Sequence, residues 1–161
     1  MMLLFKNLLF TLVMPGTVAV YVPLLIARNR TAASGARFFA ALGMFALGGV
    51  LYFGCVWNFA TQGRGTPLPL DAPKTLVVGG PYRFTRNSMC LGVLTVISGW
   101  AVLFGSWALV AYAAGVGACF HLFIVLYEEN HLRRKFGSQY EDYCSRVGRW
   151  LPMPGRRPEG R

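Results

Sequence analysis

Side chains that could bind a charged or aromatic ligand are concentrated in two stretches of the chain, residues 74–92 and 121–149. The first carries Tyr82 and Arg86 around a Gly-Gly-Pro turn, and the second carries the adjacent carboxylates Glu128–Glu129. A carboxylate suits an amino group, an arginine suits a carboxylate, and an aromatic ring suits a cation or a nucleobase. Brought together in space, these side chains would form a candidate binding site.

The other reactive residue types form no pattern typical of a metal site or a hydrolytic site. The four cysteines, Cys55, Cys90, Cys119 and Cys144, include no Cys-x-x-Cys pair, and there are only two histidines. Structural zinc sites use sets of closely spaced Cys and His ligands. We therefore expect no metal and no nucleophile–base triad, and we expect the cysteines to be reduced thiols in apolar surroundings.

The composition indicates which elements must position the polar side chains. Of 161 residues, 55% are hydrophobic and only 14% are charged, and the mean hydropathy is +0.45. A soluble domain usually carries about 25% charged residues. These values exclude a disordered chain and argue against an ordinary soluble enzyme. They favour a membrane protein, provided that the apolar residues form runs of about 20.

The apolar residues do form such runs. Residues 8–27 and 38–60 carry no charged side chain, and neither do residues 87–127. The last run is long enough for two helices, so we expect a tight turn at Gly105–Ser106, placed at a membrane interface because unpaired backbone groups are costly in lipid. The prediction is an all-α polytopic integral membrane protein with about four transmembrane helices.

The last two spans, near 88–104 and 107–127, are predicted to form a helical hairpin followed by an amphipathic cytoplasmic tail. Gly137 is expected to end the first tail helix. Ser138 precedes Glu141 by three residues, which is the spacing of a capping box, and a second short helix is predicted to begin there.

We expect a single domain, 1–161, with two N-terminal helices in residues 1–60 and a core in residues 61–152. Because the hairpin helices are antiparallel, the start of the first and the end of the second are neighbours. This geometry places residues 82–87 beside Glu128–Glu129. A polar cluster at the mouth of a membrane hairpin is a candidate functional site.

The net charge of +10 predicts the orientation of the chain. Thirteen of the sixteen basic residues lie in the N-terminal segment, the 61–86 loop and the tail, and three lie at 28–37. The positive-inside rule therefore places both termini in the cytoplasm and leaves the 28–37 loop outside. We expect a protein of the bacterial inner membrane whose basic tail contacts anionic lipids. Nucleic-acid binding is not favoured, because no base-stacking platform accompanies the charge.

Two motifs carry a resemblance to a known family. Residues 76–92 read LVVGGPYRFTRNSMCLG, and residues 128–152 read EENHLRRKFGSQYEDYCSRVGRWLP. With their spacing, they resemble the isoprenylcysteine carboxyl methyltransferase and phospholipid methyltransferase group of integral membrane enzymes, over about Thr66 to Pro152. The resemblance implies S-adenosylmethionine as methyl donor. It also implies an in-line methyl transfer, which needs alignment and exclusion of water rather than a metal or a triad.

The resemblance implies which positions bind the cofactor, and the chemistry of the cofactor carboxylate adds Arg86. The positions are Lys74, Thr75, Leu76, Val77, Tyr82, Asn87, Ser88, Met89, Cys90 and Glu128. Ser88 and Cys90 depart from the family pattern, which has Pro and Tyr there. These departures remove an aromatic ring from the edge of the pocket.

Two further positions bear on the methyl acceptor. Ile124 stands where the prenylcysteine enzymes carry a substrate-binding arginine, which argues against a prenylcysteine carboxylate as substrate. His121 lies two helical turns before Glu128 and could replace that polar contact. The candidate substrate-binding residues are therefore His121 and Ile124, and an apolar carboxylate, a lipid amine and a small thiol stay open as acceptors.

The same residues allow other interpretations. Glu129 could form a surface ion pair with Arg133, four residues later. Asn87 could cap its helix. Arg149 could anchor the tail or form a contact that closes the site, and we favour the anchor. At the level of function, a sterol-reductase-like NADPH-dependent membrane reductase shares the tyrosine-rich tail. The two departures from the family pattern are also compatible with a catalytically inactive membrane scaffold.

Overall fold

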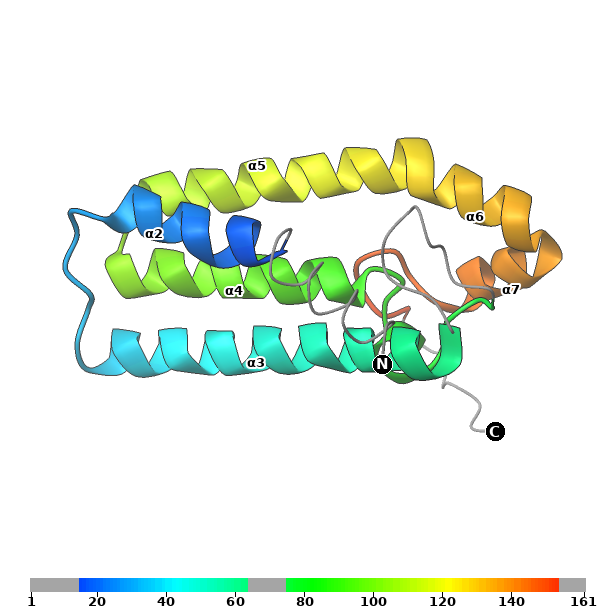
Figure 1. Ribbon diagram of the computed structural model, residues 1–161, viewed down its shortest axis with the longest axis horizontal. Helices are drawn as coiled ribbons and strands as arrows, with labels where there is room; N and C mark the ends of the chain where they lie inside the picture. Colours follow the sequence, from blue (N-terminus) through cyan, green and yellow to red (C-terminus); the bar gives the residue numbers. More distant parts are fainter. Residues whose placement is uncertain (1–14, 64–74, 154–161) are drawn as a thin grey trace.

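The structure is a computed structural model that describes residues 15–63 and 75–153, and these residues form an all-helical bundle, as the sequence predicts. The α-helices are α2 (Val22–Ala27), α3 (Ala36–Asn58), α4 (Ser88–Phe104), α5 (Trp107–Phe123), α6 (Glu129–Phe136) and α7 (Ser138–Arg146). The π-helical segments are η1 (Thr17–Tyr21), η2 (Phe59–Gly63) and η5 (Ile124–Glu128), and η4 (Gly80–Arg83) is a 3-10 helix. Helix α4 is antiparallel to α3 and α5, so the end of α3, the start of α4 and the end of α5 lie at one end of the bundle (Figure 1).

Two helical stretches are long and apolar enough to cross a membrane, Ala36–Gln62 and Trp107–Phe136. Helix α4 is also apolar, but its 17 residues fall short of the roughly 20 that span a bilayer core. The predicted first span, 8–27, lies partly outside the described residues. The count of four spans therefore stays a prediction.

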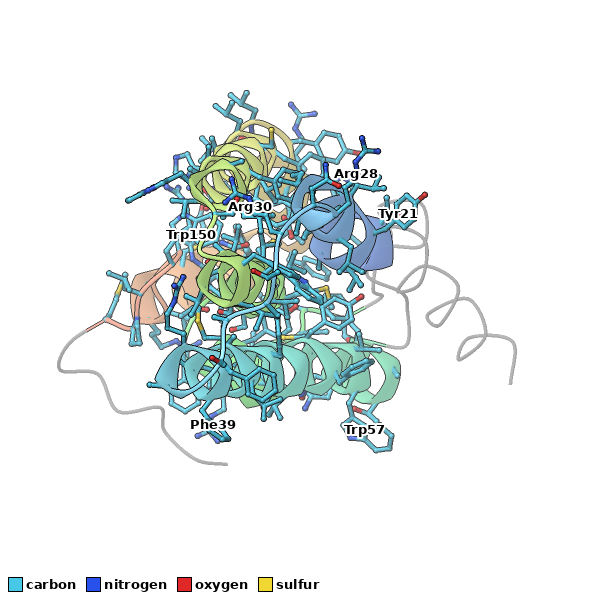
Figure 2. All side chains as sticks on the ribbon, turned by 90° about the vertical axis from the view of Figure 1, so that its left-hand side faces the viewer. Tyr21, Arg28, Arg30, Phe39, Trp57 and Trp150 are labelled. Atoms are coloured by element: carbon cyan, nitrogen blue, oxygen red, sulfur yellow. The ribbon has the colours of Figure 1, made fainter. Side chains whose placement is uncertain are left out.

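Helix α3 presents large apolar side chains to the outside of the bundle. Phe39, Phe53 and Trp57 are 62–69% exposed, and Figure 2 shows Phe39 and Trp57 pointing away from the other helices. Ile97 of α4, in contrast, is fully buried. A wide apolar face of this kind is unusual on a soluble monomer and suits contact with lipid.

The predicted turn between α4 and α5 lies at the expected residues. Gly105 has φ +55°, a left-handed conformation that glycine adopts at low cost. Beside it, Arg37 at the start of α3 donates a hydrogen bond of 3.2 Å to the carbonyl oxygen of Val102 in the last turn of α4. A cation is stabilising at a helix C-terminus. Arg37 is one of the three basic residues that the predicted topology leaves on the outer side of the membrane. The hydrogen bond gives it a structural partner there.

Glycines allow α3 and α4 to pack closely. A Cβ atom on Gly48 would lie 2.7 Å from the carbonyl oxygen of Gly92, and one on Gly92 would lie 3.0 Å from the carbonyl oxygen of Gly48. Small residues permit such backbone approach between helices in membranes. The close contact holds the first half of α4, and with it the polar loop that precedes α4, against α3.

The N-terminal helix is joined to the bundle by hydrogen bonds that follow from one proline. Pro23 has no N–H, so the carbonyl oxygen of Ala19 loses its helical partner. Trp100 of α4 donates to that oxygen at 2.8 Å, and Tyr112 of α5 donates to the carbonyl oxygen of Val18 at 2.9 Å. Both carbonyl oxygens thus have a donor inside the protein, as lipid surroundings require.

The tail folds back towards the start of α4. Gly137, with φ +51°, ends α6 as predicted, and α7 begins at Ser138. The predicted capping box is not formed, because the cap residue is Gly137 and no side chain caps the helix. Instead, α7 is held by Tyr143, whose hydroxyl donates a hydrogen bond of 2.8 Å to the carbonyl oxygen of Tyr82.

Candidate functional site

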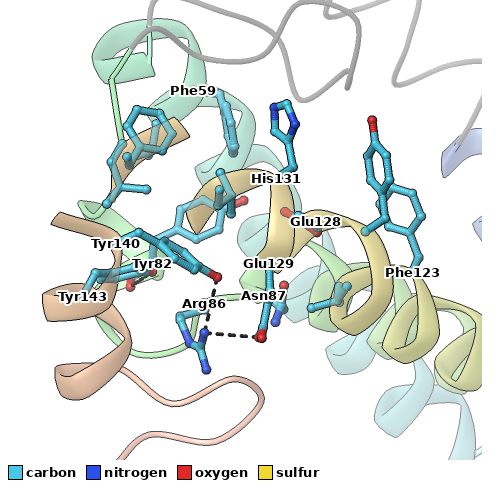
Figure 3. Close-up of a pocket in the computed structure, with 16 residues that line it drawn as sticks. Phe59, Tyr82, Arg86, Asn87, Phe123, Glu128, Glu129, His131, Tyr140 and Tyr143 are labelled. Atoms are coloured by element: carbon cyan, nitrogen blue, oxygen red, sulfur yellow. Dashed lines mark hydrogen bonds and ion pairs between the residues drawn. The ribbon is translucent and has the colours of Figure 1, made fainter. Parts of the chain in front are cut away.

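A cavity of about 160 Å³ lies at the end of the bundle where α4 begins and α5 runs into η5. Its lining comes from η2, the 76–87 loop, the last residue of α5, η5, α6 and α7 (Figure 3). The lining residues are Phe59, Leu76, Val77, Tyr82, Arg86, Asn87, Phe123, Ile124, Tyr127, Glu128, Glu129, His131, Leu132, Phe136, Tyr140 and Tyr143. The two polar stretches of the sequence therefore do meet at one end of the hairpin.

The cavity brings together most of the binding residues that the sequence predicts. Those that line it are Leu76, Val77, Tyr82, Arg86, Asn87, Ile124 and Glu128. The predicted residues outside its lining are Thr75, Ser88, Met89, Cys90 and His121. Lys74 lies outside the residues that the structure describes.

Glu129 is a buried carboxylate clamped between two arginines. Arg149 donates two hydrogen bonds to it, 2.7 Å from Nε to Oε1 and 2.9 Å from Nη2 to Oε2. Arg86 Nη1 lies 3.2 Å from Oε1. The expected surface pair with Arg133 is therefore wrong, because Glu129 faces inward. The expectation that Arg149 anchors the tail is corrected too, since this arginine closes the site.

Glu128 lies on the other side of the same helical turn. It is half-buried and lines the cavity, and Figure 3 shows it pointing away from the Arg86–Glu129 pair. No described residue forms a hydrogen bond or an ion pair with its carboxylate. A partly desolvated carboxylate of this kind is costly to maintain and is ready to bind a cationic group of a ligand.

Arg86 makes most of its contacts with other side chains of the protein. Its Nη1 also lies 2.9 Å from the Cys144 sulfur and 3.4 Å from the Tyr140 hydroxyl. Its Nε is buried and has no acceptor among the described residues. The charge of Arg86 is thus balanced by Glu129, and one N–H donor is left unsatisfied beside the cavity.

A C-terminal strap, residues 147–150, closes the back of the site. The backbone N–H of Arg86 donates to the carbonyl oxygen of Gly148 at 2.9 Å, and the Asn87 side chain donates to the carbonyl oxygen of Arg149 at 3.0 Å. The expectation that the Asn87 side chain caps α4 is therefore wrong, because it makes no capping bond. Its amide joins the strap to α4 instead.

The outer end of the strap fixes His121. Trp150 donates a hydrogen bond of 3.1 Å from its indole N–H to His121 Nδ1, and the two rings are stacked with centroids 6.2 Å apart. His121 is exposed and lies outside the cavity lining. The structure thus gives this histidine a partner in the tail.

Ser88 stabilises the loop that carries Tyr82. Its hydroxyl lies 2.8 Å from the carbonyl oxygen of Pro81 and 3.0 Å from that of Thr85, and it is buried. A proline at position 88 would have no hydroxyl for these contacts. The departure from the family pattern at this position is therefore accommodated by local hydrogen bonding.

Buried tyrosines form the floor of the cavity. Burial raises the pKa values of Tyr82, Tyr140 and Tyr143 above the ordinary phenol value, because the charged form would be desolvated. These hydroxyls therefore stay protonated at neutral pH. Phe59 packs edge-on against Tyr82, with ring centroids 5.6 Å apart, so the floor is aromatic and without charge.

One wall was not predicted from the sequence. Phe123, Tyr127 and His131 form a stack of rings four residues apart, with centroids separated by 5.3 and 6.1 Å. All three line the cavity. Their i, i+4, i+8 spacing is visible in the sequence and places them on one helical face. It could have been used to find this wall.

The chain was compared with known protein families and with curated proteins. A family model described as "Phospholipid methyltransferase" matches residues 36–139, well over half of the chain. The match begins at the first residue of α3 and includes all cavity-lining residues except Tyr140 and Tyr143. No curated protein matches the chain.

Proposed function

The chain belongs to the phospholipid methyltransferase family, and on this premise we propose that it is a membrane methyltransferase that binds S-adenosylmethionine in the cavity. The observation that carries the proposal is the half-buried Glu128 carboxylate, which has no described partner in a cavity walled by aromatic rings. A ligand with cationic groups and a flat aromatic base fits such a site.

The residues present fit the chemistry of the cofactor. Glu128 suits its α-amino group, and the unsatisfied N–H of Arg86 suits its carboxylate. The rings of Tyr82 and Tyr127 suit the adenine or the sulfonium. When bound, the cofactor supplies an activated methyl group, and the task of the protein is to align the reactants and to exclude water.

The acceptor is proposed to be apolar or membrane-associated. Phe123 and Tyr127 line the cavity and are about half exposed, and Leu126, next to Tyr127 in the chain, is exposed too. Ile124, which stands where the prenylcysteine enzymes carry a substrate-binding arginine, is buried and lines the same cavity. An acceptor could thus reach the cavity from the bilayer while the cofactor enters from the cytoplasm, where both termini are proposed to lie.

The reductase alternative is less well supported. NADPH carries a 2′-phosphate, which proteins bind with arginine. Among the described residues that line the cavity, Arg86 is the sole cation of fixed charge, and NADPH has a pyrophosphate besides its 2′-phosphate. No described feature of the lining therefore favours a second phosphate site.

A titration tests the proposed function. The full chain in detergent is titrated by calorimetry with S-adenosylhomocysteine and, separately, with NADPH. We expect binding of S-adenosylhomocysteine and none of NADPH. Binding of NADPH alone would support the reductase, and binding of neither would support the scaffold; either result would overturn the proposal.

A further inference from the structure

His131 is the one imidazole among the described residues that line the cavity. It lies on α6, three residues after Glu128, and is exposed. Its ring stacks on Tyr127 with an interplanar angle of 8°, which restricts its orientation. In the view of Figure 3 the imidazole stands at the rim between Phe59 and Phe123. It is thus in contact with both the cavity and water.

The other polar side chains of the lining are unsuited to accept a proton from a substrate. Arg86 has no acceptor atom, and the carboxylate of Glu129 is used by the hydrogen bonds of two arginines. The buried tyrosine hydroxyls are donors at neutral pH. Glu128 is assigned to the cofactor amino group in the proposed function, on which this inference rests.

An imidazole at the rim of the cavity bears on which class of methyl acceptor the protein uses, because the classes differ in their need for a base. A carboxylate acceptor is already ionised at neutral pH and needs no base. An alkylamine holds its proton more tightly than a thiol does, and the proton affinity of a thiol is closer to that of an imidazole. A thiol is therefore the acceptor class that gains most from an imidazole, and the thiolate is its reactive form.

We propose that the methyl acceptor is an apolar thiol and that His131 is the base that deprotonates it. The S–H proton moves to the free ring nitrogen of His131, which leaves a thiolate in the cavity. The thiolate sulfur then forms a bond to the methyl carbon. The bond from that carbon to the sulfonium sulfur breaks, and its electron pair goes to that sulfur. The products are a methyl thioether and S-adenosylhomocysteine, and the exposed imidazolium returns its proton to water.

The experiment uses the full chain in detergent, loaded with S-adenosylhomocysteine, and 1-octanethiol as the probe. Formation of the thiolate is followed by its ultraviolet absorbance at neutral pH. The variants are His131→Asn and His131→Gln. The control is Arg134→Asn, which changes an exposed basic residue of the same helix outside the cavity lining.

We expect the bound thiolate in the wild-type protein and in the control, and at least about a tenfold weaker signal in both His131 variants. All four proteins should still bind S-adenosylhomocysteine, which shows that they are folded. With labelled S-adenosylmethionine, octanethiol should be methylated in preference to octylamine and octanoate. An equal thiolate signal in the His131 variants, no thiolate in the wild type, or preferred methylation of the amine or carboxylate would overturn the inference. Failure of S-adenosylhomocysteine to bind at all would instead overturn the proposed function.

Discussion

The two ends of the helical bundle differ in how they accommodate polar groups. At the hairpin end, two residues join α4 to α5, with Gly105 in a left-handed conformation and Arg37 on a carbonyl oxygen of the last turn of α4. At the cavity end, the chain instead buries Glu129 between Arg86 and the partly exposed Arg149, and it leaves Glu128 without a described partner. At the hairpin end, Ser106 is the one described residue whose buried side-chain oxygen has no partner. The cavity end keeps a cluster of charged groups that are not needed for a turn, and this difference supports the proposal that the cavity is the functional site.

Among the variants that test this difference between the two ends, Glu129→Ala is expected to lower stability most. It leaves two guanidinium groups facing each other without their carboxylate, so the free energy of unfolding should fall by about 3 kcal/mol. Chemical denaturation in detergent measures this loss. The control Glu141→Ala removes an exposed carboxylate of α7 and should change stability by no more than about 0.5 kcal/mol. Equal losses in the two variants would show that the cavity end is not held by its buried charges.

A smaller effect is expected at the hairpin end from Gly105→Ala. The left-handed conformation costs a residue with a Cβ about 1–2 kcal/mol, and that Cβ would also displace the Arg37 side chain. Stability should fall by this amount, while affinity for S-adenosylhomocysteine should not change. Gly43→Ala is the matched control, because a Cβ at Gly43 in α3 meets no neighbouring atom. A loss of ligand affinity in Gly105→Ala would contradict the separation of the two ends.

The smallest effect is expected from Trp150→Phe, which removes the hydrogen bond to His121 and keeps an aromatic ring in the strap. Stability should fall by about 1 kcal/mol or less, with little change in ligand affinity, because the main bonds of the strap lie at Gly148 and Arg149. Trp107→Phe, at an 84% exposed position of the hairpin end, serves as control. A tenfold loss of affinity, equal to about 1.4 kcal/mol, would show that the outer end of the strap shapes the cavity.

The hairpin end was predictable from the sequence, and the cavity end was predictable only in part. Gly105 and Gly137 end helices because their backbone conformation is a local property of glycine. The meeting of the two polar stretches follows from the antiparallel hairpin. The same hairpin predicts that Arg86 lies beside Glu128–Glu129, and the structure pairs it with Glu129, 43 residues later. It does not predict the pair with Arg149, because that arginine reaches Glu129 only through the fold of the tail, 20 residues further along the chain. A local rule of helix spacing pointed to Arg133 instead.

The aromatic wall of Phe123, Tyr127 and His131 is not predicted from the sequence, for a different physical reason. Phe123 and Tyr127 lie within a long apolar run, where any aromatic residue is compatible with a lipid-facing surface. Their spacing places these rings and His131 on one helical face, and the fold shows that this face lines a cavity. Composition predicts that such a helix is in the membrane, and it does not predict which of its faces meets a ligand.

Titration of Glu128→Gln with S-adenosylhomocysteine tests the central claim most directly. The substitution keeps the shape of the side chain and removes its charge, so it should leave the fold intact and weaken binding at least about tenfold, the value of one charged hydrogen bond at roughly 1.5–3 kcal/mol. The control Glu141→Gln removes the same charge from an exposed site and should bind like the wild type. Unchanged binding in Glu128→Gln would contradict the claim that this carboxylate holds the cofactor.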